Sequence, residues 1–187
     1  VIAIKVLADE GLMETDAVQR LQEEALITSR LNHPAIINIY DFQRDGEIGF
    51  ITMERLQGGT LRRMMDERSI SGQTFTEDES ILYAVQISEA HQYAHLFTVH
   101  RDLKPENIMF DQQGTVKIID YGSVKIAGIA EISPLEQGDE ENVLGTLNYT
   151  APEYHLGQTG TVSSDLYSLG TITYEMLRSE EHTSELQ

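Results

Sequence analysis

The nine residues from Val99 to Asn107 read V-H-R-D-L-K-P-E-N and place an acid, a base and an amide in one short segment. Pro105 excludes a helix here and biases Lys104 towards an extended conformation, so we expect a loop. In phosphoryl transfer, Asp102 can orient an attacking hydroxyl, Lys104 can offset phosphate charge, and Asn107 can offer an oxygen to a metal ion. We interpret the segment as a catalytic loop, with a charged surface turn as the alternative.

The composition limits the class of protein. With 187 residues, of which 40% are hydrophobic, the chain can form one domain or most of one. It has no cysteine, which excludes disulfides and thiolate metal sites, and no apolar run approaches membrane-spanning length. A cytoplasmic setting fits these features. A formal charge of −18 disfavours nucleic acid and anionic membranes as partners.

Both ends suggest a fragment. The first residues, V-I-A-I-K, already have the pattern of a strand, and no initiator methionine precedes them. The last ten residues, Arg178 to Gln187, resemble the translation of a widely used sequencing adapter. We therefore leave residues 178–187 out of our expectations for the fold.

The N-terminal region predicts a strand over Val1 to Leu7 and then a helix from about Thr15 to Asn32. Glu24 lies within the apolar face of that helix, and burying its carboxylate unpaired would be costly. Lys5 is the candidate partner. A half-exposed Glu24 is the alternative, and Glu23 is the second choice for the pair. The apolar positions of the helix are Val18, Leu21, Ala25, Thr28 and Leu31.

Two further β-rich runs, Ile36 to Phe42 and Gly49 to Met53, are separated by the turn signal Arg44-Asp45-Gly46 and predict a hairpin. The chain then passes through M-E-R-L into Gly58-Gly59-Thr60-Leu61. By itself this segment is an ordinary connection from a strand to a helix.

A long helix is predicted to begin near Thr76, with the buried stripe listed below. His91 and His95 lie four residues apart, which is metal-ligand spacing. However, Gln92 stands where a metalloprotease helix needs a general-base glutamate, so a zinc site is disfavoured. The predicted stripe consists of Tyr83, Ile87, Ala90 and Ala94.

After Asn107, the runs Ile108 to Phe110 and Val116 to Ile119 predict a second hairpin around Gln113-Gly114. It leads to Asp120-Tyr121-Gly122, and later segments read A-P-E at residues 151–153 and D-L-Y-S-L-G at residues 165–170. Each of these motifs is weak alone. Their order and spacing relative to the catalytic loop make them informative.

Together, A-I-K with a helical glutamate, H-R-D-L-K-P-E-N, D-Y-G and A-P-E resemble the eukaryotic-like Ser/Thr protein kinases of bacteria. The resemblance covers nearly all of residues 1–177. It implies a two-lobed α+β fold truncated at both ends. Residues 1–56 would form part of a β-rich N-lobe from its third strand to the hinge, and residues 57–177 part of a helical C-lobe.

The resemblance also implies ATP and Mg²⁺ as cofactors. Lys5, paired with Glu24, would bind the α- and β-phosphates. Asn107 and Asp120 would bind the metal, and Asp102 and Lys104 would act on the acceptor hydroxyl and the γ-phosphate. The implied adenine site has Met53 as gatekeeper, the Glu54 carbonyl and the Leu56 amide as hinge contacts, and Ala3 and Met109 on either side of the ring.

The implied activation segment departs from the family pattern at Tyr121, which replaces a phenylalanine. The ring can still pack on His100, but a buried hydroxyl needs a partner. The segment's implied residues are Asp120, Tyr121, Gly122, Ser133, Thr146, Ala151, Pro152 and Glu153, and its structural anchors are His100, Arg101 and Asp165.

Regulation is a separate hypothesis. Arg101 often binds a phosphate on the activation segment in this family, and the acidic run Asp139-Glu140-Glu141 can substitute for that phosphate. A solvated acidic loop is the preferred alternative. Glu153 normally pairs with an arginine of a later helix, which we do not expect in this chain.

Lys104 and Gly145-Thr146 point to Ser/Thr of proteins as acceptors. The stretches beginning at Ser123 and Tyr149 resemble bacterial proteins that join this kinase domain to a metal-dependent phosphatase domain, which would lie upstream of Val1. The resemblance allows a membrane anchor elsewhere in the whole protein. The alternative function is a nucleotide-binding pseudokinase or scaffold, and we expect the fragment alone to be inactive.

Overall fold

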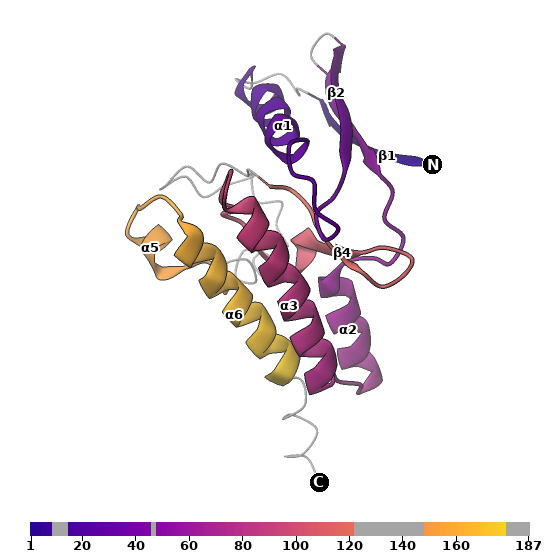
Figure 1. Ribbon diagram of the computed structural model, residues 1–187, viewed down its shortest axis with the longest axis vertical. Coiled ribbons are helices and arrows are strands. Elements are labelled where there is room, and N and C mark those ends of the chain that lie inside the picture. The colour runs from indigo at the N-terminus through magenta and orange to yellow at the C-terminus, as the bar shows by residue number, and fades with distance from the viewer. Residues whose placement is uncertain (9–14, 46–47, 122–147, 179–187) are drawn as a thin grey trace, which may run out of the picture.

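The computed structural model describes residues 1–8, 15–45, 48–121 and 148–178, and only the backbone of residues 7, 8 and 15–21. Figure 1 shows a sheet with one helix above a group of helices. Several sequence expectations lie outside the described residues. They concern Gly122, Ser133, Thr146, the acidic run at 139–141 and residues 179–187.

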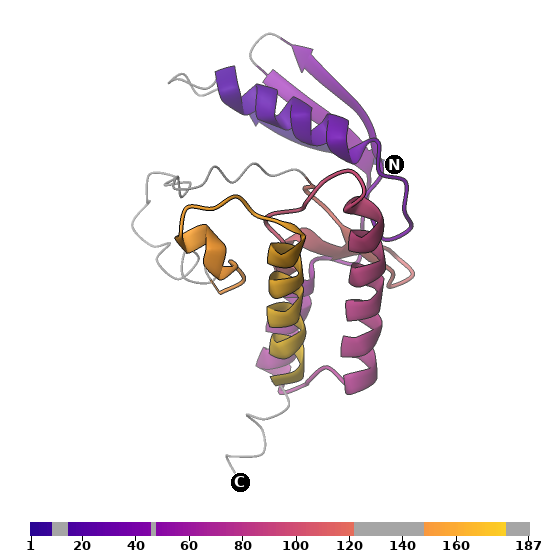
Figure 2. The same cartoon turned by 60° about the vertical axis from the view of Figure 1, so that its left-hand side comes forward.

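The upper part is a three-stranded antiparallel sheet in the order β1-β3-β2. Its strands are β1 (Ile2–Ala8), β2 (Ile39–Asp45) and β3 (Ile48–Glu54). Helix α1 (Thr15–Thr28) lies across one face of this sheet (Figure 2). Ala25 of α1 and Ile51 of β3 are almost fully buried and form a small core between helix and sheet.

Helix α1 ends four residues before its predicted end at Asn32. After Thr28 the chain tightens, and the amides of Arg30 and Leu31 bond to carbonyls three residues earlier, at 3.1 and 3.0 Å. Pro34 follows closely and cannot continue a helix. The turn carries Leu31 away from the sheet into the larger core below, where it is 3% exposed.

The first three residues of the predicted strand 36–42 do not belong to the sheet, so that boundary was wrong. Ile37 donates its amide to the carbonyl of Ile118 at 3.0 Å, and Ile118 donates to the carbonyl of Ala35 at 2.9 Å. Because their backbone groups bond to the lower part, residues 35–37 connect the two parts and β2 begins only at Ile39.

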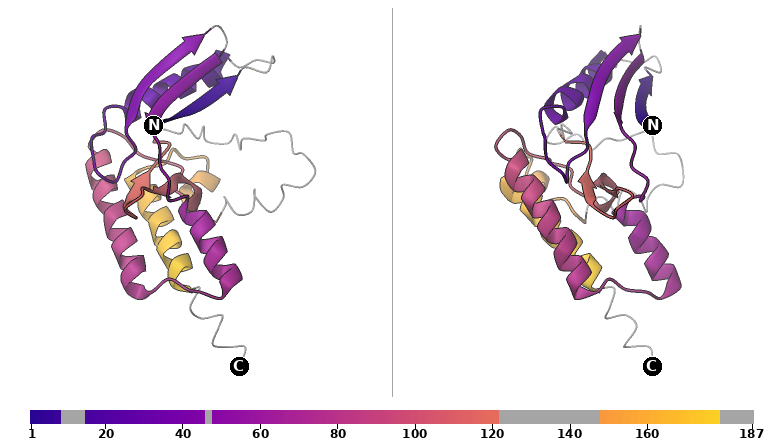
Figure 3. Two further views of the ribbon diagram at one scale, coloured as in Figure 1. Left: turned by 90° about the vertical axis from the view of Figure 1, so that its right-hand side faces the viewer. Right: turned by 45° about the vertical axis from the view of Figure 1, so that its right-hand side comes forward.

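The lower part is helical, with a short hairpin beneath the upper sheet (Figure 3). Its longer helices run side by side below the hairpin, and a short one lies at about the level of the hairpin (Figure 1). They are α2 (Leu61–Ser71), α3 (Glu77–Ala94), the short α5 (Pro152–His155) and α6 (Val162–Arg178). The hairpin pairs β4 (Ile108–Phe110) with β5 (Val116–Ile118), and the 3-10 turn η1 (Pro105–Asn107) precedes β4.

Helix α3 begins where the sequence predicts, because Thr76 and Glu79 cap each other in a reciprocal capping box. Its buried face packs on α6 in the larger core. Of the predicted stripe, Ile87, Ala90 and Ala94 are fully buried, whereas Tyr83 is only partly buried. With a β-rich part and a helical part, the predicted α+β class is confirmed.

Gly58 offers a test of the packing between the connection after β3 and the β4 hairpin. A Cβ on Gly58 would lie 2.6 Å from Cβ of Phe110 and 2.9 Å from two backbone oxygens. We expect Gly58→Ala to lower the free energy of unfolding by about 1–3 kcal/mol in urea titrations, since backbone must move. Gly170→Ala, in an exposed and open position of α6, is the control and should stabilise by about 0.5–1 kcal/mol. Equal effects would contradict this account.

Candidate active site

The catalytic loop is held by a buried carboxylate at the start of α6. Asp165 is 1% exposed, and its Oδ2 and Oδ1 accept the backbone N–H groups of His100 and Arg101, each at 2.8 Å. Arg101 has a φ of 70°, a left-handed conformation that costs a non-glycine residue about 1–3 kcal/mol unless its surroundings enforce it. The two bonds to Asp165 supply that constraint.

The loop brings together the three groups that the sequence predicts for phosphoryl transfer. Nζ of Lys104 lies 3.1 Å from Oδ2 of Asp102. Nδ2 of Asn107 donates to the Asp102 carbonyl at 2.8 Å and lies 3.3 Å from its Oδ2. Because its NH₂ group is used in this way, the amide of Asn107 keeps its oxygen as the atom to offer to a ligand.

The conformation of this loop differs in one respect from the prediction. Lys104 is extended, with φ −154° and ψ 163°, as the following proline requires. However, Pro105 does not exclude a helical turn, because it begins the single 3-10 turn η1. Proline is tolerated at the first position of a turn, where its missing N–H would have had no partner. The turn buries Asn107.

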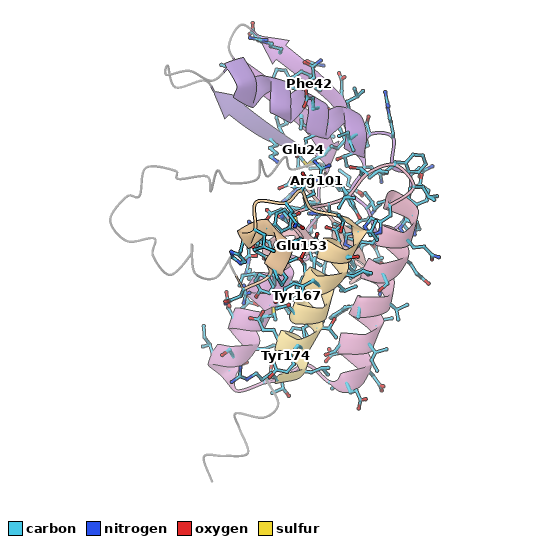
Figure 4. The ribbon with its side chains drawn as sticks, turned by 90° about the vertical axis from the view of Figure 1, so that its left-hand side faces the viewer. Glu24, Phe42, Arg101, Glu153, Tyr167 and Tyr174 are labelled. Carbon is cyan, nitrogen blue, oxygen red and sulfur yellow. The ribbon has the colours of Figure 1, made fainter. Side chains whose placement is uncertain are left out.

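Across the junction between the two parts, Lys5 of β1 contacts two carboxylates. Its Nζ lies 2.9 Å from Oε1 of Glu24 and 2.9 Å from Oδ1 of Asp120. Glu24 is therefore the partner, while the side chain of Glu23 is exposed. Figure 4 places Glu24, from α1, and Arg101, from the catalytic loop, where the sheet meets the helices.

The electrostatics of this cluster follow from burial and from its charge balance. Burial by itself would lower the pKa of Lys5, but Asp120 and Glu24 outweigh it and raise that pKa above its usual 10.5. Burial raises the pKa of Glu24, and the negative charge of Asp120 adds to the increase against the effect of Lys5. The Lys5 ammonium thus contacts both carboxylates of the cluster.

Tyr121 follows Asp120 and is fully buried. Its ring packs on that of His100, with 4.7 Å between centroids. The sequence left open which group would satisfy its hydroxyl. The structure places Nδ1 of His91, from α3, 3.2 Å from that hydroxyl. In the sequence, His91 on the buried face of α3 could have indicated this partner, but it was considered only as a metal-ligand candidate.

The structure also gathers His91, His95 and Asp165, whose ligand atoms lie within 4.8 Å of one another. Nε2 of His95 lies 2.9 Å from Oδ2 of Asp165, which also accepts the His100 amide. Hydrogen bonds therefore already occupy both oxygens of Asp165, and the cluster is explained by the catalytic-loop anchor without a metal ion.

The residues expected around adenine lie at the junction. Ala3 of β1 pairs in register with Met53 of β3, and Met109 of β4 forms a bridge with Thr60. Leu56 is half-buried in the connection. Directly after it, residues 57–60 line a cavity of about 160 Å³ with Arg63, Met64 and Glu67 from α2.

Glu54 makes side-chain contacts that sequence reasoning missed. Its Oε1 accepts from the backbone N–H of Asn38 at 2.8 Å and from Nζ of Lys117 at 2.9 Å. Lys117 is only 8% exposed. Because Lys117 lies within the apolar run of β5, its charge needs a partner, and this could have indicated a nearby carboxylate.

The chain reaches α5 through the A-P-E motif. Ala151 is fully buried and Pro152 is the first residue of α5. Oε1 of Glu153 accepts a hydrogen bond from Oγ of Ser164 at 2.5 Å. Within the described parts of the chain, Ser164 is thus a partner of Glu153 in the place where the family resemblance implies an arginine.

Arg62 of α2 is the centre of a charged network that the sequence did not predict. Its guanidinium lies 3.0 Å from Oε1 of Glu175 on α6 and 3.2 Å from Oε1 of Glu106 in the catalytic loop. It also contacts the hydroxyl of Tyr149, which in turn contacts Glu175. The network joins the catalytic loop to two helices and to the segment before A-P-E.

The fold has a sheet part and a helical part, and these residues lie where the two parts meet. The protein kinase domain family matches residues 1–186, so the chain belongs to that family. The chain is 35% identical to the serine/threonine-protein kinase PknD of Protochlamydia amoebophila and 33% identical to PrkC of Bacillus subtilis. It is 34% identical to PknA of Mycobacterium tuberculosis. These alignments cover 93–94% of the chain.

The chain spans only 20%, 26% and 40% of the lengths of these three relatives. The family match runs to residue 186, so it does not distinguish the last ten residues from the rest, and their exclusion stays a prediction. None of the helices in the described ranges has the length and apolar character needed to cross a membrane.

The anchor can be tested with Asp165→Asn. An amide has one acceptor oxygen, so at least one of the two loop amides loses its partner. We expect the free energy of unfolding to fall by about 1–3 kcal/mol. In hydrogen exchange, the amides of His100 and Arg101 should exchange faster. Asp78→Asn, at an exposed position of α3, is the control. Unchanged exchange at residues 100 and 101 would contradict the anchoring.

His91 predicts a pH dependence of stability. Burial and, secondarily, the neighbouring His100 lower its pKa from 6.5 to about 3, with His95, Tyr121 and Asp165 also nearby. Between these pH values His91 is protonated in the unfolded chain but not in the folded state. The free energy of unfolding therefore falls as pH decreases from about 6.5 towards 3. Urea titrations should show a shallower decrease for His91→Leu than for the parent. Parallel curves would refute this prediction.

Proposed function

We propose that the whole protein transfers the γ-phosphoryl group of ATP to Ser or Thr hydroxyls of other proteins. The observation that carries this proposal is that Asp102 forms an ion pair with Lys104 and a hydrogen bond with Asn107, while Lys5 meets Glu24 and Asp120 at the same junction. The relatives whose names include serine/threonine-protein kinase support the same activity.

In this proposal Lys5 binds the α- and β-phosphates of ATP and Glu24 orients its ammonium. The 2.9 Å contact with Glu24 fixes Nζ at the junction of the two parts. The raised pKa of Lys5 keeps it charged at physiological pH. Nζ also contacts Asp120, so bound phosphates and this carboxylate would share one cation.

The residues expected to hold a divalent cation fit that task. Asn107 offers an amide oxygen and Asp120 a carboxylate, which are the hard oxygen ligands that Mg²⁺ prefers. The amide of Ile119 donates to the carbonyl of Asn107 at 3.0 Å, which places the two ligands on adjoining backbone segments. A bound Mg²⁺, the ion we propose, would neutralise phosphate charge.

Asp102 would accept the proton of the attacking hydroxyl, and Lys104 would offset charge on the γ-phosphate. Both side chains are largely shielded from solvent, at 15% and 22% exposed. For adenine, we propose the Glu54 carbonyl and the Leu56 amide as hydrogen-bond partners. Met53 would be the gatekeeper, and the ring would lie between Ala3 and Met109.

We propose the domain boundaries given by the resemblance, with residues 1–56 as part of the N-lobe and 57–177 as part of the C-lobe. The whole protein would work in the cytoplasm, since ATP is its phosphoryl donor. We further propose that a phosphatase domain lies upstream of Val1 in the whole protein. It rests on the likeness of the stretches after Ser123 and Tyr149 to kinase–phosphatase fusions.

A nucleotide-binding pseudokinase is the alternative. It is less well supported, because Lys5, Glu24, Asp102, Asn107 and Asp120 all have the residue type that transfer chemistry needs, and they converge on one junction. A scaffold would have no need to keep every one of these groups. Measured transfer by the whole protein separates the two functions.

The test uses Asp102→Asn in the full-length protein. We expect transfer of labelled phosphate to a Ser/Thr acceptor to fall by about 10²–10⁴-fold, because the proton acceptor is lost. ATP binding should stay within about threefold, since the nucleotide contacts lie on other residues. Asp78→Asn, an exposed carboxylate on α3, should leave both unchanged. Transfer by Asp102→Asn at the parent rate would refute the role of Asp102.

A further inference from the structure

Tyr121 lies in an apolar environment, but its side-chain hydroxyl and its backbone carbonyl both make polar contacts. Its side chain is 0% exposed and belongs to the larger core. The hydroxyl lies 3.2 Å from Nδ1 of His91, and the backbone carbonyl accepts from Oγ1 of Thr28 at 3.2 Å. A buried hydroxyl without a partner costs more than its hydrogen bond returns. The contact with His91 is therefore needed if the tyrosine is to stay in this position.

His91 is equally unusual at its own position. It lies on the buried face of α3, with Ile87, Ala90 and Ala94, and is 1% exposed. Its Nε2 has no hydrogen-bond partner within the described parts of the chain, whereas its Nδ1 contacts the hydroxyl of Tyr121. The rings of His91 and Tyr121 also meet edge to face, with centroids 5.8 Å apart. The Tyr121 hydroxyl and Nδ1 of His91 thus satisfy each other in an apolar environment.

The contacts of Tyr121 extend to both parts of the molecule. Through His91 the residue contacts α3 of the helical part, and through Thr28 it contacts α1 of the sheet part. Glu24 lies one turn before Thr28 on α1 and binds Lys5, which in turn contacts Asp120. Asp120 immediately precedes Tyr121 and has a φ of 60°, so a change in the position of the Tyr121 ring would alter this strained backbone and its carboxylate.

We propose that His91 is a positioning residue that acts through Tyr121, holding Asp120 in the orientation in which its carboxylate meets Lys5 and can bind the metal of Mg²⁺-ATP. This inference rests on the proposed function. His91 touches neither nucleotide nor acceptor. Its effect on phosphoryl transfer comes from the hydrogen bond that keeps the Tyr121 ring against His100.

The test is a double-mutant cycle in the full-length protein, with His91→Leu, Tyr121→Phe and the double variant. His91→Leu leaves the hydroxyl buried without its partner. We expect kcat to fall by about three- to tenfold and the Mg²⁺ concentration for half-maximal ATP binding to rise by a similar factor. Adding Tyr121→Phe removes the orphaned hydroxyl and should restore both values to within about twofold of the parent.

Tyr83→Phe is the matched control. It removes the same atom from a tyrosine on α3 that packs on Phe75 and Phe110 instead of Tyr121. Its kcat and Mg²⁺ dependence should equal those of the parent. Melting temperatures of all variants distinguish the positioning role from a purely structural one. A purely structural role would lower stability without changing kcat per folded molecule or the Mg²⁺ dependence.

Three outcomes would overturn the inference. One is a His91→Leu variant with parental kcat and Mg²⁺ dependence, another is a double variant no better than His91→Leu, and the third is a Tyr121→Phe variant that is faster than the parent. A parent protein that transfers no phosphate would instead refute the proposed function. In that case the Mg²⁺ dependence of ATP binding in the same four proteins still decides whether His91 positions Asp120.

Discussion

The carboxylate of Asp165 is buried at the start of α6 and accepts two consecutive amides of the catalytic loop, those of His100 and Arg101. A loop cannot bury unpaired N–H groups, and Arg101 cannot keep its left-handed conformation without support. Asp165 meets both requirements, and His95, the C-cap residue of α3, contacts the same carboxylate. The positions of Asp102, Lys104 and Asn107 follow, because all three lie on the segment that this anchor fixes.

A second constraint connects the two parts of the molecule. Lys5 approaches Glu24 and Asp120 only because α1 lies on the sheet while the β4 hairpin lies beneath it. Residues 35–37 reinforce this arrangement through backbone bonds to Ile118, and Glu54 reinforces it through Lys117. The junction therefore depends on several polar contacts between segments far apart in the chain, in addition to apolar packing.

Much of the fold was accessible from local patterns. The period of apolar residues located α1, α3 and the strands, and Thr76 with Glu79 marked the start of α3. The errors fell at boundaries. The end of α1, the residues before β2 and the turn η1 were misjudged, because tertiary hydrogen bonds and buried side chains decided where each element stopped. Propensity is too weak to decide such positions against packing.

The sequence by itself determined which chemical groups are present and in what order, because the catalytic loop, D-Y-G and A-P-E are short and their residues are neighbours in the chain. Tertiary structure decided which groups meet. Lys5 contacts Asp120 across 115 positions, Tyr121 contacts His91 across 30, and Lys117 contacts Glu54 across 63. Periodicity assigns a residue to a face of its own helix or strand, but the residue opposite is set by how whole elements pack. For that reason the sequence offered His91 only as a disfavoured metal-ligand candidate, whereas in the fold it is the partner of Tyr121.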